Sequence, residues 1–468
     1  FWDMPMFHPA RNTGAYSEVM LGVGPLYWPW RALGVPADTA YQLWLLGVTS
    51  LNFLVALWLL RAGFGVGRVP AVVGAVLFAA GASRLNQANH PQLLPQFYCL
   101  LAVLALLVLG REETGRRRGV VWAGVFVLAC VAQLYGGFYW GWFLGFFLLL
   151  ALLVALGFRD TRAALVRGLR VHGPALVVFG GLGVVALVPL ARHSLEAVQE
   201  VGLRRYEELG SMIPRFLSWF HLGADSWLYG WTAGLSAFRR IPVEGEHRVG
   251  LGLVTAGVAA VALWRARGRP GVRLLLGVTV LTLLLSTRYR GGFEPWWLVF
   301  QTVPGAGAVR AVSRVGVWLL LPASLGLALF LERLERGGRR MAALVVGGVC
   351  LLEQGVSGMR FEPRESRADV EALVVRVEPG CASFLYTPAG GEFPSWKYQG
   401  DAIWAALEAG VPTVNGYSGN APPSWRLEPI LLAEPGAPGR LEAALRDWER
   451  ARGLAPGAIC RIREHARR

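Results

Sequence analysis

Charged residues are scarce in this chain of 468 residues, because only 16% are Asp, Glu, Lys or Arg while 54% are apolar. Soluble domains carry about a quarter charged residues, so this balance excludes an ordinary soluble enzyme and indicates a protein embedded in a bilayer. Lys397 is the only lysine, and the net charge of +15 therefore comes almost wholly from arginine. The arginines gather in short loops between apolar runs, which excludes a nucleic acid partner.

The sequence also lacks the short motifs that mark metal and nucleotide sites. Its five cysteines follow no metal-ligand spacing, and it contains neither HExxH nor a glycine-rich phosphate loop. We therefore expect no cofactor and assign no divalent metal. Cys99, Cys130 and Cys350 lie in apolar runs, where cysteine is a small core residue. Cys381 and Cys460 fall in the final polar segment and could form a disulfide if that segment is exported.

Long apolar runs, by contrast, are abundant. A spanning helix needs about 20 mostly apolar residues. That rule predicts ten spans, near 42–60, 69–83, 93–110, 119–134, 138–157, 173–191, 250–264, 271–287, 315–332 and 341–355. The continuous run 119–157 is divided at Tyr135-Gly136-Gly137, because two glycines beside aromatic residues suit a tight turn at the membrane interface.

Loop charges then predict the topology. Alternate loops are rich in arginine, namely those with Arg61 and Arg68; Arg111, Arg116, Arg117 and Arg118; Arg159, Arg162, Arg167 and Arg170; Arg265, Arg267, Arg269 and Arg273; and Arg333, Arg336, Arg339 and Arg340. The short loops between them carry Arg84 alone, or no arginine. Since arginine is held on the cytoplasmic side, segments 1–41, 192–249, 288–314 and 356–468 are predicted to lie outside.

The predicted fold class is an α-helical polytopic membrane protein of about ten spans, in the inner (plasma) membrane, with a small C-terminal α/β extracytoplasmic domain. Residues 1–41 form an outer loop with an interfacial helix, 42–191 and 250–355 hold the transmembrane helices, and 192–249 is a large outer loop. Segment 288–314 is expected to be re-entrant, and 356–468 is the exported domain. In that domain CASFLYT, PTVN and AICRIR read as strands, and QGDAIWAALEAG and GRLEAALRDWERARG as helices.

Three polar groups on the predicted outer side could carry chemistry. The first segment supplies Asp3, His8, Arg11 and Glu18, and a carboxylate at the membrane surface can act as a general base. Its alternative role is an interfacial helix that these residues cap. The other two groups bring residues that could bind a lipid phosphate. Their alternative roles are to form a turn at the membrane surface or to snorkel to lipid headgroups. These residues are Arg84 and His90 between two early spans, and Arg288, Arg290, Arg310 and Arg314 in segment 288–314.

Four segments together resemble one family, the bacterial GT-C-type integral-membrane glycosyltransferases, including their YfhO-like branch. They are FHPARNTGAYSEVMLG, VVGAVLFAAGASRLNQANHPQLLPQF, VPGAGAVRAVSRVGVWLLLP and PTVNGYSGNAPPSW. The resemblance implies a polyprenyl-phosphate sugar donor, an extracytoplasmic acceptor and inverting displacement. It makes Glu18 and Asp3 the candidate bases, and it makes Arg84, His90, Arg310 and Arg314 the candidate donor-phosphate contacts.

In this family an acidic residue of the first outer loop, close to a preceding helix, is the expected base. The chain opens on Phe1 with no such helix before it, so we expect an N-terminally truncated sequence. Two other functions stay open. A transporter or flippase for lipid-linked glycans would use polar groups in mid-membrane, of which Asn52 and Gln133 are the few present. A non-enzymatic envelope factor would use the turn Gly416–Asn420 to bind polymer.

Overall fold

The computed structural model describes residues 1–358, 362–388, 395–427 and 437–463. The chain divides into two compact units. Unit 1 comprises 1–19, 188–203 and the described residues from 362 onward, and unit 2 comprises 20–187 and 204–358. The division passes through the long helix α8 (Arg159–Val201). It also cuts the predicted outer loop 1–41 after Val19, so that loop contributes to both units.

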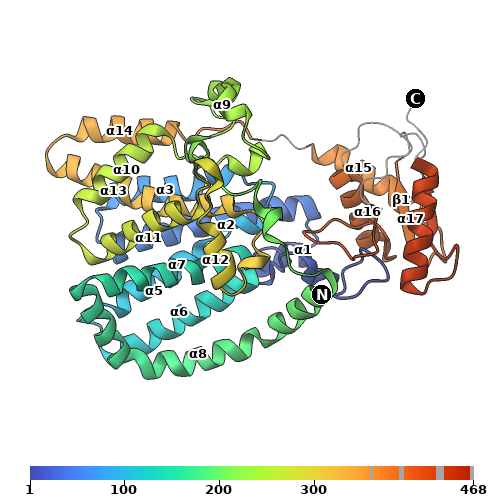
Figure 1. Ribbon diagram of the computed structural model, residues 1–468, viewed down its shortest axis with the longest axis horizontal. Helices are drawn as coiled ribbons and strands as arrows, with labels where there is room; N and C mark the ends of the chain where they lie inside the picture. Colours follow the sequence, from blue (N-terminus) through green and yellow to red (C-terminus); the bar gives the residue numbers. More distant parts are fainter. Residues whose placement is uncertain (359–361, 389–394, 428–436, 464–468) are drawn as a thin grey trace. The chain divides into compact units, whose positions relative to one another are not determined.

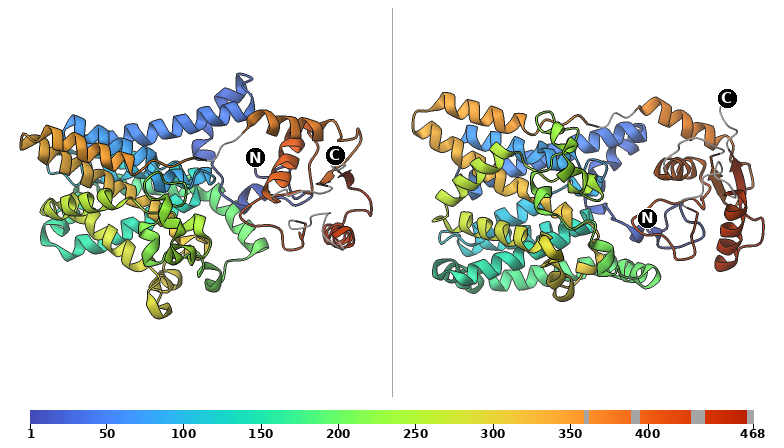
Figure 2. Two further views of the ribbon diagram at one scale, coloured as in Figure 1. Left: turned by 90° about the horizontal axis from the view of Figure 1, so that it is seen from above. Right: turned by 45° about the horizontal axis from the view of Figure 1, so that its top comes forward.

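Unit 2 is helical, and its long helices run alongside one another in Figure 1 and in both views of Figure 2. The helices are α1 (Trp28–Ala32), α2 (Ala37–Trp58), α3 (Arg68–Ala80), α4 (Ala82–Leu85), α5 (Phe97–Leu109), α6 (Arg116–Gly136), α7 (Phe138–Gly157), the first part of α8, α9 (Ser236–Arg239), α10 (Leu253–Arg265), α11 (Pro270–Ser286), α12 (Trp296–Thr302), α13 (Leu320–Arg336) and α14 (Arg340–Leu352). Short 3-10 helices join them, including η8 (Glu244–His247) and η11 (Val312–Leu319).

Seven described helical segments are long and apolar enough to cross a membrane, which makes the chain a multi-pass membrane protein by length and composition. They are 37–63, 68–85, 91–109, 116–136, 138–157, 159–201 and 312–336. Three further predicted spans coincide with shorter apolar helices, α10, α11 and α14. Each of the ten predicted spans therefore falls on a helix, but only seven of the described helical segments are long enough by themselves to cross a membrane.

Helix α13 forms the centre of unit 2, since 83% of the apolar window of η11 and α13 is buried. It packs against α3 on one side and α10 on the other. Glycines permit both contacts, because a Cβ on Gly74 would lie 2.7 Å from the carbonyl oxygen of Ser324, and one on Gly326 would lie 2.6 Å from Cα of Ala259. Small residues at helix crossings let backbones approach closely, which is how helices associate within a bilayer.

Unit 1 contains the described part of the C-terminal region. Its elements are α15 (Pro363–Val374), β1 (Phe384–Thr387), α16 (Ser395–Ala409), α17 (Ala437–Arg452) and β2 (Cys460–Arg463). Strands β1 and β2 pair in parallel, with Phe384 opposite Cys460, and Cys381 forms a disulfide with Cys460. The predicted strand PTVN contributes an isolated bridge from Thr413 to Phe384 rather than a named strand.

Candidate functional site

Three connecting segments of unit 2 bring ionisable side chains together. His90 lies in the turn between α4 and α5, and Glu246 lies in η8. Arg310 lies just before the span Val312–Arg336 that contains α13, and Arg314 lies in its first turn. Gln87 helps to join the first two segments, because its Nε2 donates to the carbonyl oxygen of Gly245 at 3.4 Å. We call His90, Glu246, Arg310 and Arg314 the His90–Glu246 cluster.

Arg314 and Glu246 form a two-pronged ion pair at the centre of this cluster. Nε of Arg314 donates to Oε2 of Glu246 at 3.1 Å, and the terminal NH2 donates to Oε1 at 2.7 Å. Only 4% of the Arg314 side chain and 10% of the Glu246 side chain are exposed. Paired hydrogen bonds of this kind fix the orientation of both groups, so Arg314 and Glu246 form a rigid base for the cluster.

Tyr139, in the first turn of α7, holds the segment that carries both arginines. Its hydroxyl oxygen accepts hydrogen bonds from the backbone N–H groups of Arg310 and Ala311, at 3.0 Å and 3.1 Å. The guanidinium of Arg314 lies over the Tyr139 ring, 5.0 Å from its centroid. The side chain of Arg310 is half-buried. This anchoring fixes the backbone from which Arg310 projects.

Electrostatics within the cluster leave His90 neutral. Nε2 of His90 lies 3.5 Å from Oε1 of Glu246. Burial, together with the positive charges of Arg314 and Arg310, lowers the pKa of His90 to about 4 despite the nearby carboxylate. Burial raises the pKa of Glu246, but the hydrogen bonds and charge of Arg314, with His90 and Arg310, outweigh it and bring the pKa below its ordinary value. At neutral pH two guanidinium groups therefore face one carboxylate.

The structure brings together three of the residues that the sequence predicted, His90, Arg310 and Arg314. It adds Glu246, which the sequence analysis missed. The segment EGEH, in the predicted large outer loop, reads as an ordinary solvated turn. Charge balance is only a partial signal, because a buried arginine can be satisfied by a carboxylate, as Arg314 is, or by neutral oxygens, as Arg84 is.

Arg84 is engaged elsewhere in unit 2. It is 2% exposed, and its three nitrogens donate to the carbonyl oxygens of Phe78 and Leu94 and to Oε1 of Gln96. These bonds satisfy carbonyl groups at the end of α3 and just before the start of α5. Within a bilayer such carbonyl groups need a partner inside the protein. The observed contacts give Arg84 a structural role, and a contact with donor phosphate stays a prediction.

Arg288 and Arg290 also lie apart from the contacts of the cluster. Nε of Arg288 lies 3.0 Å from Oε1 of Glu294, and its NH1 donates to the carbonyl oxygen of Gly210. Arg290 is exposed in a glycine-rich turn. Between these arginines and Arg310, the short helix α12 buries Trp296 against Trp142 and Phe146 of α7.

The four candidate residues of the first segment belong to unit 1. Asp3 is exposed, and its Oδ1 accepts the backbone N–H of Asn12 at 2.6 Å, which stabilises the turn. His8 is half-buried, and burial lowers the pKa of its side chain. Arg11 is exposed and Glu18 is half-buried. All four residues therefore lie in unit 1 rather than in unit 2, which holds the His90–Glu246 cluster. Their catalytic or binding roles remain predictions.

The turn NGYSG packs against that first segment within unit 1. The backbone N–H of Phe7 donates to the carbonyl oxygen of Asn415, and Nδ2 of Asn420 donates to that of Tyr16. Asn415 is fully buried and bonded to Gln399 and to the backbone of Tyr386. These contacts favour a structural role for the turn over polymer binding.

Gly416→Ala should destabilise unit 1 markedly, because a Cβ there would lie 2.0 Å from the ring of Phe7, which is 1% exposed. Overpacking of this kind costs about 1–3 kcal/mol. Thermal unfolding of the purified chain measures the effect, and Gly439→Ala is the matched control because its Cβ would meet open space. Equal unfolding temperatures for the two variants would contradict the packing described for the turn.

A second polar network lies in the segment before α10. Oε1 of Glu244 bonds with Nε2 of the buried His221, and Arg248 binds both Glu244 and Asp225, at 2.8 Å each. Burial raises the pKa of Glu244, but the bonds to His221 and Arg248 prevail and lower it to about 2. Within the described ranges no group of three or more His, Cys, Asp or Glu residues could hold a metal ion. This network therefore holds the segment together.

Comparisons with known proteins add a distant likeness to a solved structure. No family model matches the chain, and no curated protein matches it. Among solved structures, the cryo-EM structure of the arabinofuranosyltransferase AftD from Mycobacteria is similar, with 17% sequence identity and a TM-score of 0.44. The similarity covers 88% of this chain and 28% of AftD, so the chain spans less than a third of that protein's length. A likeness at this level does not assign an activity, which has to rest on the residues of this chain.

Proposed function

We propose that the chain is a membrane glycosyltransferase of the GT-C type. It moves a sugar from a polyprenyl-phosphate donor to an extracytoplasmic acceptor, a lipid-linked glycan or cell-envelope polymer, with inversion at the anomeric carbon. The observation that carries the proposal is the surplus positive charge of the His90–Glu246 cluster. Two guanidinium groups face one carboxylate beside a neutral imidazole, at connections between apolar helices. Such a place suits the phosphate of a lipid whose chain lies in the bilayer.

The two arginines have different roles in this proposal. Arg314 donates two hydrogen bonds to Glu246, and its guanidinium lies over the Tyr139 ring, so it holds the other groups of the cluster in place. Arg310 is half-buried, and no carboxylate of the described residues lies within ion-pair distance of it. Arg310 is therefore the guanidinium that contacts the donor phosphate. A donor placed there gains a charge-assisted hydrogen bond that strengthens as the phosphate departs.

The reaction is a single displacement. The acceptor hydroxyl oxygen attacks the anomeric carbon, the bond from that carbon to the phosphate oxygen breaks, and the lipid phosphate leaves with the electron pair. A base takes the proton of the acceptor hydroxyl. Glu246 is a poor base, because its hydrogen bonds to Arg314 hold its pKa below the ordinary value. Glu18 and Asp3 are the proposed bases.

The same proposal places the protein in the inner (plasma) membrane with the C-terminal region outside. The disulfide between Cys381 and Cys460 supports the outside location, because disulfides persist in oxidising compartments and are rare in the cytosol. The acceptor and donor chemistry would then occur on the same side as the predicted outer loops.

A transporter function gains no support from the mid-span polar residues. Asn52 donates to the carbonyl oxygen of Leu94 and accepts the backbone N–H of Gln96. Gln133 donates to the carbonyl oxygen of Pro95 and accepts from the thiol of Cys99. Both amides thus stabilise the interrupted start of α5, and their observed contacts are structural rather than part of a substrate path.

Transfer of labelled sugar from a polyprenyl-phosphate donor, in membranes that contain this chain, tests the proposal. Glu18→Gln should lower the rate about 100-fold or more if Glu18 is the base, since general bases contribute about 10²–10⁴-fold. Asp3→Asn is the parallel variant, and Glu207→Gln, which changes an exposed glutamate, is the control. Rates unchanged in both Glu18→Gln and Asp3→Asn would show that neither is the base. Absence of transfer from every donor would contradict the enzyme class.

A further inference from the structure

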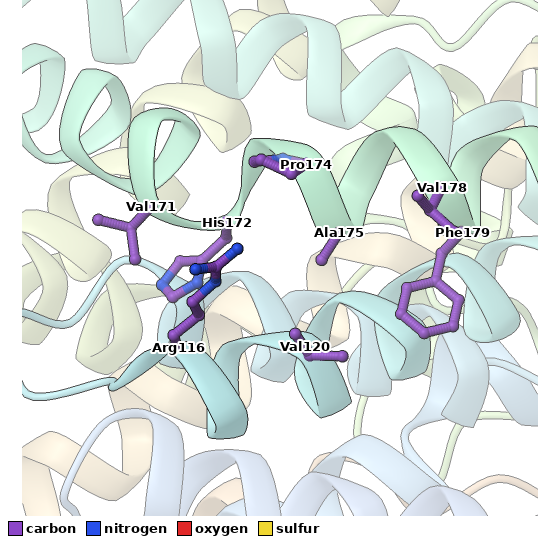
Figure 3. Close-up of a pocket in the computed structure, with 8 residues that line it drawn as sticks. All are labelled: Arg116, Val120, Val171, His172, Pro174, Ala175, Val178 and Phe179. Carbon is purple, nitrogen blue, oxygen red and sulfur yellow. The ribbon is translucent and has the colours of Figure 1, made fainter.

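A second site in unit 2 is a groove between helices α6 and α8. Its volume is about 290 Å³, and it is lined by Arg116, Val120, Val171, His172, Pro174, Ala175, Val178 and Phe179. Figure 3 shows Arg116 and His172 at one end, Phe179 and Val178 at the other, and Ala175 and Val120 between them. The groove therefore has a basic end and an apolar end.

Glycines explain why the groove exists. On one side His172 packs on Gly119, where a Cβ would lie 2.1 Å from Nδ1. On the other side the ring of Phe179 packs on Gly124, where a Cβ would lie 3.2 Å from the ring. The helices are thus held together at both ends of the groove. Between these contacts the facing side chains, Val120 and Ala175, are too small to fill the gap.

The groove is bordered by a surface that faces lipid. Only 6% of the most apolar window of α8 is buried, and Val120 and Val178 are both exposed. A cavity of this size is at the lower end of the range for whole ligands, about 300–1,000 Å³, so it accommodates part of a chain rather than a complete ligand. In a bilayer such an apolar groove is open to acyl chains.

The basic end has the features of a phosphate site. Arg116 begins α6, whose N-cap Gly115 offers no side-chain acceptor to the first N–H groups. Positive side chains oppose the helix dipole there, and an anion would relieve both effects. Of the two acidic residues just before α6, Glu112 lies 2.9 Å from Arg167, and Glu113 is exposed. No carboxylate of the described residues lies within ion-pair distance of Arg116.

His172 is the independent observation that points to a ligand. It is 3% exposed and lines the groove, and its Nδ1 has no hydrogen-bond partner in the described part of the chain. Either ring nitrogen of an imidazole can donate to a ligand oxygen when it carries the proton. A buried imidazole next to an unpaired guanidinium suits an anionic headgroup.

We propose that this groove binds an anionic phospholipid, with its phosphate at Arg116 and His172 and part of one acyl chain between Val120, Ala175 and Phe179. Basic pockets between transmembrane helices on the arginine-rich side recognise lipid headgroups in this way. The site is separate from the His90–Glu246 cluster. Helix α6 has 21 residues, hence a length of about 30 Å, and Tyr139, which binds the backbone of Arg310 in the cluster, follows its far end.

Native mass spectrometry of the purified chain with phosphatidylglycerol or phosphatidylcholine of identical acyl chains tests the proposal. We expect the parent to retain phosphatidylglycerol about fivefold more tightly than phosphatidylcholine, and Arg116→Gln to abolish the difference, since one arginine near a headgroup contributes about 1 kcal/mol. Arg117→Gln is the matched control, because both arginines are exposed and Arg117 points about 100° away from Arg116 around the same helical turn. Ala175→Phe fills the groove and should remove bound lipid without changing charge.

Three results would overturn the proposal. Equal losses in Arg116→Gln and Arg117→Gln would indicate diffuse attraction to charge rather than a site. Equal retention of phosphatidylglycerol and phosphatidylcholine by the parent would show that the groove does not select an anionic headgroup. Preferential retention of a polyprenyl phosphate over phosphatidylglycerol would assign the groove to another lipid. Thermal unfolding of each variant verifies folding, and the two arginine variants decide the matter even if Ala175→Phe does not fold.

Discussion

Arg310→Gln is expected to lower sugar transfer about 100-fold at limiting donor concentration, with little change in thermal stability. The reason is that Arg310 is the half-buried guanidinium of the His90–Glu246 cluster that has no carboxylate partner among the described residues. Removing one preorganised donor from the group that stabilises a departing anion costs about 10²–10³-fold in rate. Transfer of labelled sugar from a polyprenyl-phosphate donor measures the effect.

Two further variants make this result specific. Arg310→Lys keeps the charge but not the planar two-pronged geometry, so we expect it to recover part of the activity. Arg240→Gln removes an exposed arginine immediately after α9, in the predicted large outer loop, and should leave transfer unchanged. Equal rates for Arg310→Gln and Arg240→Gln would mean that Arg310 does not contact the donor.

Arg314→Met is expected to destabilise unit 2 by about 3–5 kcal/mol, because it leaves the carboxylate of Glu246 buried without its partner. The Arg314 and Glu246 side chains are only 4% and 10% exposed, so water cannot replace the lost bonds. The second change Glu246→Gln, made in the same chain, removes the buried charge and should restore most of the stability. Unfolding of the two single variants and the double variant measures this coupling.

Acid should weaken the same cluster. The pKa of His90 is lowered to about 4, so between the ordinary value of 6.5 and pH 4 the unfolded chain takes up a proton that the folded chain does not. The pKa of Glu246 is lowered from 4.5, so its stabilising contribution is complete above that pH and is lost as pH falls further. In the double variant the part of the pH dependence that is due to Glu246 disappears.

For the coupling between the two residues, equal stability of Arg314→Met and of the double variant would show that Glu246 does not depend on Arg314.

The helices of unit 2 were largely predictable from the sequence. Runs such as 138–157 and 119–134 fall on α7 and α6, because apolar length alone decides which segments can cross a bilayer. The division of 119–157 at two glycines was also right, since α6 ends at Gly136 and α7 begins at Phe138. Local composition was sufficient in these cases, because a spanning helix satisfies its backbone hydrogen bonds internally.

The partners of the polar residues were not predictable in the same way. Arg84 and Arg314 look alike in the sequence, each an arginine at the end of an apolar run. In the structure Arg84 bonds to backbone carbonyl groups and a glutamine, whereas Arg314 binds the carboxylate of Glu246. Which partner an arginine meets depends on residues 68 positions away in the case of Glu246, and no local pattern records that distance.

By itself, the sequence determined that this protein is built from membrane-spanning helices, because apolar length and the scarcity of charge are local properties that the bilayer reads directly. Only the tertiary structure decided which charges meet. It placed Glu246 against Arg314 and His90, joined Cys381 to Cys460, and packed Gly416 on Phe7. The physical reason is that the pairing of a buried charge, a thiol or a glycine depends on segments distant in the chain, which only packing brings together.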